Sequence, residues 1–187
     1  SVPSKRKEIK LVHRPTALPH EFRIYDMSIP KRLLTLILVG SACVTLDQTT
    51  KIFAATYLPR HVMRTYLFDI LRIGYSENTG GFLGIGNALP SAVRFWIFTV
   101  AVGIFLVLLL YYLITHIEHR TGSVIGLSLV LSGGASNLYD RIINQGSVVD
   151  FLNLGIGPLR TGVFNLADVA IFGGIAIALY SQSRHKA

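Results

Sequence analysis

The sequence is poor in cysteine and in charge. Cys43 is its single cysteine, so no disulfide can form within the chain, and packing and backbone hydrogen bonds must hold the fold. Charged residues make up only 15% of the 187 residues, against 51% hydrophobic residues and a mean hydropathy of +0.50. This composition excludes an ordinary water-soluble domain of this length and favours a single small membrane domain.

Several catalytic patterns are also missing from the sequence. It has no HExxH motif and no Cys/His cluster that could hold a metal, and no histidine is placed for a triad with a membrane serine. The Gly-rich stretches lack a phosphate-binding lysine in register. These absences argue against a zinc protease, a serine hydrolase and a nucleotide-dependent enzyme.

The charge that is present is concentrated near the N-terminus, where eight of the 18 lysines and arginines precede residue 33. An apolar body with a basic flank favours attraction to anionic lipid over nucleic-acid binding. Residues 1–30 contain four prolines and no sustained apolar period, which predicts a basic cytoplasmic extension with little packed structure. A start of translation at Met27, or added sequence before it, is a hypothesis that the intact mass of the native protein tests.

Long apolar segments predict a membrane domain of residues 31–183 with four spanning helices. The predicted spans are 33–56, 94–115, 123–140 and 164–182. Four spans put both termini on one side, and the basic flanks identify that side as the cytoplasm, with 184–187 as a short tail. The first span also faintly resembles a lipoprotein signal peptide ending at Cys43. That alternative fails because Gly40 stands where a large aliphatic residue is expected and because more spans follow.

Two segments between the predicted spans lie outside the membrane on this topology. The first, 57–92, contains a β-like stretch around Tyr66 to Tyr75, followed by a Gly-rich turn at 78–81. The second, 141–163, contains a turn cluster at 155–158 and is expected to be a returning extracytoplasmic loop. The predicted fold is therefore an all-α membrane protein with four transmembrane helices and a small outer β-like segment.

Four acidic residues lie within or beside the apolar segments: Asp47, Asp140, Asp150 and Asp168. Burying an ionised carboxylate at membrane depth costs several kcal/mol, so such residues are candidates for function. The predicted topology gathers all four near the outer boundary. Two carboxylates held close in a poorly hydrated site share a proton, which is the chemistry of an aspartyl protease. The structural alternative is that each aspartate caps a helix or pairs with an arginine, as Asp140 and its neighbour Arg141 suggest.

Five ordered motifs between residues 33 and 182 resemble those of the lipoprotein signal peptidases, or signal peptidase II. The motifs are DQTTK from Asp47, NTGGFLG from Asn78, GGASNLYDR from Gly133, VVDF from Val148 and FNLAD from Phe164. One motif alone would be weakly specific, whereas five in this order on a four-span frame are highly specific. Three positions depart from the usual pattern: Ser136 replaces a glycine, Phe82 a small residue and Leu83 an aromatic residue. The last two put substrate preference in doubt more than catalysis.

The resemblance implies an intramembrane aspartyl endopeptidase that removes the signal peptide of diacylglyceryl-modified prolipoproteins by cutting before the lipidated cysteine. It implies a catalytic pair, Asp150 and Asp168, without metal or organic cofactor. The residues that match the family's surrounding polar shell or substrate-binding positions are Asp47, Lys51, Asn78, Gly80, Asn137, Asp140, Arg141 and Asn165. The expected setting is the bacterial inner membrane, with the active site near the outer face, a monomeric protein, and membrane lipid and prolipoprotein as partners.

Alternatives remain for individual residues and for the whole chain. Asp47 is expected to give structural support by hydrogen bonding an outer loop or Arg141. Lys51 either snorkels to the interface or touches substrate. Asn78 either belongs to the polar shell of the site or only closes a turn. Close helix packing is an alternative role for Gly133 and Gly134. For the whole chain, a small proton-conducting transporter would distribute its acids through the membrane depth, and a non-cleaving binder of lipidated peptides would keep the same frame.

Overall fold

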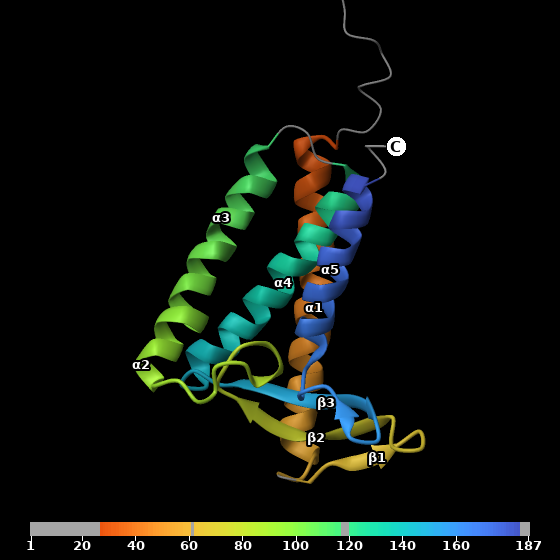
Figure 1. Cartoon of the computed structure of the whole chain (residues 1–187). Helices are drawn as coiled ribbons and strands as arrows, with labels where there is room; N and C mark the ends of the chain where they lie inside the picture. The colour runs from red at the N-terminus through yellow and green to blue at the C-terminus, as the bar shows by residue number, and fades with distance from the viewer. Residues whose placement is uncertain (1–26, 61, 117–119, 184–187) are drawn as a thin grey trace, which may run out of the picture.

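The helices of this computed structural model, which describes residues 27–60, 62–116 and 120–183, form a bundle that stands on a small sheet (Figure 1). The helical segments are α1 (Ile29–Tyr57), the short 3-10 helix η2 (Phe82–Gly84), α2 (Ser91–Arg94), the π-helical η3 (Phe95–Ala101), α3 (Val102–Thr115), α4 (Thr121–Ile143) and α5 (Leu166–Ser183). The start of α1 and the end of α5 lie at the same end of the bundle, away from the sheet. Residues 1–26 of the extension predicted over 1–30 and the tail 184–187 lie outside the described residues, while the last residues of that extension are described and α1 begins at Ile29.

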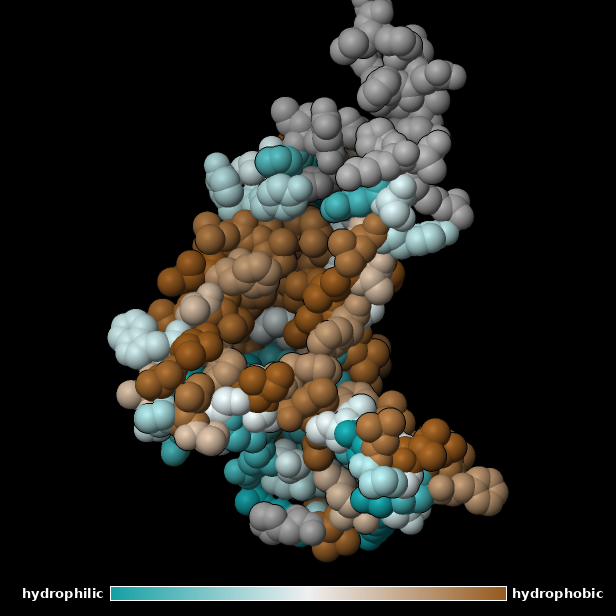
Figure 2. All heavy atoms as spheres, viewed as in Figure 1, coloured by the Kyte–Doolittle hydropathy of each residue, from teal (hydrophilic) through white to brown (hydrophobic). Residues whose placement is uncertain are grey.

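Among the described residues, three helices are long and apolar enough to cross a membrane: Ile29–Tyr57, Ser91–Thr115 and Leu166–Ser183. They cover the first, second and fourth predicted spans. Figure 2 shows hydrophobic residues over the sides of the bundle and hydrophilic residues gathered around the sheet. Helix α4 covers the third predicted span and continues to Ile143, but it is not one of these three helices, and it contains several glycines and serines and a polar last turn.

Small residues on α4 bring its backbone close to its neighbours. A Cβ atom on Gly126 would collide with the carbonyl oxygen of Gly174 on α5, and a Cβ on Gly174 would collide with the carbonyl of Gly126. Gly133 lies in the same way against Ala167 of α5, and Gly134 lies against Leu106 of α3. Close packing is therefore the role that the structure supports for Gly133 and Gly134.

The described strands form one antiparallel sheet in the order β1-β2-β3-β4. Their bounds are β1 (Arg64–Tyr66), β2 (Leu71–Asn78), β3 (Val148–Ile156) and β4 (Leu159–Arg160). The β-like stretch expected at 66–75 is thus two strands separated by a turn, in which Leu67, Phe68 and Asp69 all have positive φ. Asp69 stabilises this turn by accepting two hydrogen bonds from Arg72, at 2.6 and 2.7 Å.

The expectation of a loop over 141–163 was wrong in its centre, because β3 occupies Val148–Ile156. Polar residues at Asp150 and Asn153 interrupt the apolar character of this strand, and both are buried. The turn predicted at 155–158 is present at Gly157 and Pro158, between β3 and β4. Pairing of β3 with β2 sets Val148 opposite Asn78 and Asp150 opposite Ser76, which carries these residues to the end of the bundle where α5 begins.

Candidate active site

Asp150 and Asp168 meet on either side of Asn165, the residue immediately before α5. The side-chain amide of Asn165 donates a hydrogen bond of 2.7 Å to Asp150, and its backbone N–H donates one of 3.2 Å to Asp168. In return, the backbone N–H of Asp168 donates to the Asn165 side-chain oxygen at 3.0 Å. Such a reciprocal pair at positions N-cap and N3 is a capping box, which fixes the start of a helix. Asn165 and Asp168 therefore lie together, as their spacing predicted, although Asn165 precedes the helix.

Asn78 holds the other oxygen of Asp150. Its side-chain amide donates to Asp150 Oδ2 and to the carbonyl of Gly81, both at 2.9 Å, while its Oδ1 accepts the backbone N–H of Gly80 at 3.0 Å. Asn78 therefore closes the turn and binds Asp150 at the same time, so the two expected roles are not exclusive. A side chain on Gly80 would collide with the backbone of Ile85 and Asn87, which explains the glycine there.

Asn137 on α4 connects Asp168 to a buried lysine. Its side-chain amide donates to Asp168 at 3.0 Å, and its Oδ1 accepts hydrogen bonds from Asn165 at 3.1 Å and from Lys51 at 2.8 Å. Because one amide oxygen receives two donors, the orientation of the Asn137 side chain is fixed: only its nitrogen can face Asp168. Three helices thus contribute to the position of one carboxylate.

Lys51 neither snorkels to the interface nor opens onto a substrate surface, since only 3% of it is exposed. Its ammonium group lies 2.7 Å from Asp47 and 2.9 Å from Asp140, in addition to the 2.8 Å bond to Asn137. Three donors therefore meet three acceptors. The two carboxylates leave this buried cluster with an excess negative charge of one, which the surrounding N–H and O–H donors stabilise.

Asp47 and Asp140 also join helices through hydrogen bonds beyond those with Lys51. Asp47 accepts the backbone N–H of Ala167 at 2.8 Å and the hydroxyl of Ser136 at 2.7 Å. These partners differ from the outer loop and Arg141 that the sequence suggested. Asp140 pairs with Lys51 rather than with its neighbour Arg141, and its Oδ1 accepts a 2.8 Å hydrogen bond from Gln48.

Gln48 and Ser136 are two members of this network that were not selected from the sequence, although both lie inside the quoted motifs. The Gln48 amide donates to Ser136 Oγ at 2.9 Å as well as to Asp140. Ser136, where a glycine is usual, is 1% exposed and forms hydrogen bonds on both sides. The only signal in the sequence was their spacing, because Gln48 follows Asp47 and Ser136 lies four residues before Asp140.

Arg141 lies at the edge of the site. Its Nη2 donates to the carbonyl of Gly80 at 2.6 Å, and its guanidinium carbon lies 5.7 Å from the centre of the Phe98 ring. Arg141 is thereby tied to the turn that also carries Asn78. The site residues named from the sequence are therefore assembled at one end of the bundle, in one network around the two aspartates.

The electrostatics of Asp150, which lies on β3 outside the helices, suit proton exchange near neutral pH. Burial and the neighbouring Asp168 carboxylate raise the pKa of Asp150 from 3.8 to about 7, against the opposing effect of its hydrogen bonds with Asn78 and Asn165. A carboxyl group with this pKa can hold or release a proton under physiological conditions. In the described part of the chain, no group of three or more His, Cys, Asp or Glu could hold a metal ion.

Comparisons with known proteins agree on one family. A sequence model of the family described as Signal peptidase (SPase) II matches residues 39–184. The lipoprotein signal peptidase of Syntrophus aciditrophicus is 34% identical over 145 residues, which cover 78% of this chain and 89% of that protein. The lipoprotein signal peptidase of Streptococcus pneumoniae is 28% identical, covering 82% and 92%. A solved structure described as a bacterial membrane enzyme, obtained by the in meso method at 2.3 Å resolution, superimposes with a TM-score of 0.70 at 27% identity, covering 82% of this chain and 90% of that one.

Proposed function

The chain belongs to the signal peptidase II family of lipoprotein-processing proteases, and from that membership we propose that it is an aspartyl endopeptidase. Its substrate is a diacylglyceryl-modified prolipoprotein, and it cuts the peptide bond before the lipidated cysteine. The observation that carries the aspartyl mechanism is the bridge between Asp150 and Asp168 through Asn165, with contacts of 2.7 and 3.2 Å. This bridge holds two buried carboxylates next to each other.

In the proposed reaction the pair carries a single proton, because two neighbouring buried carboxylates do not both ionise at neutral pH. The ionised aspartate takes a proton from a water molecule, whose oxygen attacks the scissile carbonyl carbon. The protonated aspartate gives its proton to the carbonyl oxygen, which forms a neutral diol. When the diol collapses, the first aspartate protonates the leaving amine of the cysteine, the second takes a hydroxyl proton, and the pair regains its original single proton.

The surrounding residues hold this pair in its reactive geometry. Asn78 and Asn137 each donate a hydrogen bond to one of the two aspartates, and Asn165 donates to both. We propose that Arg141, next to the pair and bonded to Gly80, helps to hold the substrate backbone and to stabilise the tetrahedral intermediate. Asp47, Lys51 and Asp140 act from behind, through Asn137 and the start of α5.

The spanning helices and the family indicate a multi-pass protein of the bacterial inner membrane. We propose four spans, with α4 as the third. Its 23 residues extend about 34 Å at 1.5 Å per residue, and its polar residues face neighbouring helices. The start of α1, which contains Lys31 and Arg32, and the end of α5 then face the cytoplasm. The sheet at the other end of the bundle (Figure 1) then lies at the outer face, together with Asp150 on β3 and Asp168 at the start of α5. Residues 31–183 form the peptidase domain and work as a monomer.

The test is cleavage of a diacylglyceryl-modified prolipoprotein by the purified protein in detergent or lipid, with the unlipidated precursor in parallel. We expect cleavage of the lipidated form only, reduced at least about 100-fold by Asp168→Asn. The matched control is Asp69→Asn, which neutralises a carboxylate in the β1–β2 turn away from the site and should leave cleavage unchanged. If the correctly folded protein binds the lipidated precursor without cleaving it, the protein is a binder of lipidated peptides and the proposed peptidase activity is wrong.

A further inference from the structure

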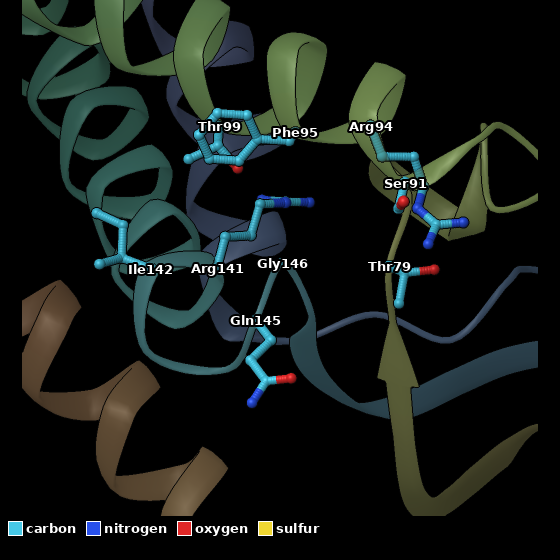
Figure 3. A pocket seen from close by; sticks show the side chains of 9 residues that line it. All are labelled: Thr79, Ser91, Arg94, Phe95, Thr99, Arg141, Ile142, Gln145 and Gly146. Atoms are coloured by element: carbon cyan, nitrogen blue, oxygen red, sulfur yellow. The ribbon is translucent and has the colours of Figure 1, made fainter.

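Two hollows join at the outer ends of α3 and α4. The first has a volume of about 400 Å³ and lies between the turn at Thr79, the start of the second spanning helix and the end of α4 (Figure 3). The second, of about 370 Å³, is a groove between α3 and α4 that is almost entirely apolar and includes Gly103 and Leu138. Thr99 and Ile142 line both hollows, so the two form one continuous depression with a polar head and an apolar tail.

The polar hollow is cationic. Arg94 and Arg141 enter it from different helices, as Figure 3 shows. Arg94 donates to the backbone carbonyls of Asn87 and Leu89 at 2.8 and 2.9 Å, and Arg141 donates to that of Gly80. In the described part of the chain, neither guanidinium has a carboxylate oxygen within 4.0 Å, and the buried Nε of Arg141 has no hydrogen-bond partner.

Two positive charges that share a partly enclosed hollow repel each other and favour an anion between them. A phosphate group suits this place, because guanidinium groups bind its oxygens with paired, charge-assisted hydrogen bonds. The hydroxyl of Ser91 adds a further donor at the same wall, whereas Thr79 donates its hydroxyl to Asn87 at 3.0 Å. A neutral diacylglyceryl group would supply only ester oxygens and would bring no negative charge to the two guanidinium groups.

The apolar groove identifies what carries the phosphate. It lies on the lipid-facing side of the bundle, where Val107 and Ile142 are 67% and 66% exposed. An acyl chain lying there would contact α3 and α4 while its head group occupies the cationic hollow. We propose that this depression binds one anionic phospholipid, with the phosphate between Arg94 and Arg141 and one acyl chain in the groove between α3 and α4.

This site shares Arg141 with the proposed chemistry and is connected to the aspartates through the turn at Gly80. Arg141 holds the carbonyl of Gly80, and the N–H of Gly80 is bonded to Asn78, which in turn holds Asp150. A phospholipid that engages Arg141 therefore stabilises the turn that carries Asn78. Lipid binding itself requires no cleavage, so it can be measured whether or not the catalytic assignment holds.

The experiment measures lipid binding to the full chain in detergent by native mass spectrometry and by thermal stabilisation. The probes are phosphatidylglycerol, phosphatidylcholine and diacylglycerol with the same acyl chains. We expect phosphatidylglycerol to bind best and diacylglycerol worst. Arg94→Gln should weaken phosphatidylglycerol binding about tenfold or more and remove most of its advantage over phosphatidylcholine. Arg64→Gln is the matched control, because it removes an exposed arginine of β1 outside the hollow and should change nothing.

A second variant tests the tail of the site without touching the arginines. A Cβ on Gly103 meets only Leu138, at 3.7 Å, so Gly103→Leu fits the helix and fills the groove. It should weaken binding of long-chain phosphatidylglycerol and leave binding of glycerophosphoglycerol, which is the same lipid without its acyl chains, unaffected. Equal binding of phosphatidylglycerol and diacylglycerol, or full binding by both Arg94→Gln and Gly103→Leu, would overturn the proposal.

Discussion

The side chain of Asp47 in α1 accepts a 2.8 Å hydrogen bond from the backbone N–H of Ala167 in the first turn of α5, 120 residues further along the chain. The first N–H groups of a helix have no partner within it, and here a different helix supplies one. Since Asp168 is the next residue, α1 helps to determine where α5 begins and where its aspartate points.

Asp47→Asn should therefore lower both stability and turnover. The variant replaces a charged acceptor of the Ala167 N–H, the Ser136 hydroxyl and the Lys51 ammonium with a neutral group. Breaking a buried ion pair in this way costs about 3 to 5 kcal/mol of unfolding free energy. Thermal unfolding in detergent measures the loss. At a temperature where the variant is folded, kcat should fall more than KM rises. An unfolding midpoint equal to that of the unaltered protein would contradict the role of Asp47 in holding the start of α5.

Lys51→Met should be among the most destabilising single changes in the bundle. Methionine matches the length of the lysine stem but leaves Asp47 and Asp140 as two buried carboxylates without a cation. We expect a loss of about 3 to 5 kcal/mol, measured as a lower unfolding midpoint. Arg60→Met provides the comparison, because the exposed Arg60–Glu77 pair should contribute no more than about 1 kcal/mol. Similar losses for the two variants would argue against a structural role for the buried cluster.

Asp150→Asn should gain stability relative to the unaltered protein as the pH rises. The folded-state pKa of Asp150 is raised from 3.8 to about 7, so between these values the folded protein holds a proton that the unfolded chain releases. The contribution of Asp150 to the free energy of unfolding is thus fully present below about pH 4 and is lost as the pH rises through about 7. The variant has no carboxyl group at this position to titrate. Its unfolding midpoint should therefore rise relative to that of the unaltered protein between pH 5 and pH 8.

Asp69→Asn is the control for that pH series. Hydrogen bonds from Arg72 hold the pKa of Asp69 below its ordinary value, so this carboxylate is ionised throughout the range from pH 5 to pH 8. The effect of the variant on the unfolding midpoint should be the same at both ends of the range. A pH-independent difference for Asp150→Asn as well would show that Asp150 is ionised throughout.

Cleavage should slow at alkaline pH if the aspartate pair works with one shared proton. The raised pKa of Asp150, about 7, means that this proton is progressively lost above neutrality, and the carbonyl oxygen then has no acid to protonate it. We expect kcat with a lipidated precursor to fall about tenfold for each pH unit well above the pKa of the pair. The measurement is the initial rate from pH 6 to pH 9 with the protein shown to be folded at each point. A rate that increased steadily to pH 9 would exclude the protonated aspartate.

The helical frame could be predicted from the sequence because membrane spans depend on length and hydropathy, which are local properties. The segment 94–115 illustrates this, since the helix from Ser91 to Thr115 contains it completely. The gathering of Asp47, Asp140, Asp150 and Asp168 at one end of the bundle followed from the same topology. The strand β3 was missed because Asp150 and Asn153 interrupt its apolar run. Asp150 is bonded to Asn78, which is far away in the sequence, and Asn153 is bonded to Arg160 only once the chain has turned back from β3 into β4.

The partners of charged residues were the least predictable part. A lysine near the end of a span has the same local sequence whether it snorkels or pairs, and only the approach of α4 decides that Lys51 meets Asp140. Likewise, the adjacency of Asp140 and Arg141 suggested a pair, but successive residues on a helix point in directions about 100° apart. Asp140 therefore faces Lys51 and Gln48, while Arg141 turns to Gly80 and the outer hollow.

The glycine contact between α4 and α5 also limits the route by which a signal peptide can reach the aspartates. Where the carbonyl of each glycine occupies the space of the other's side chain, the two backbones leave no gap through which another helix could pass. Gly133 extends the same seam toward Ala167, close to Asp168. The two helices are therefore in direct contact along this line, and an incoming transmembrane peptide has to approach from a different side of the bundle.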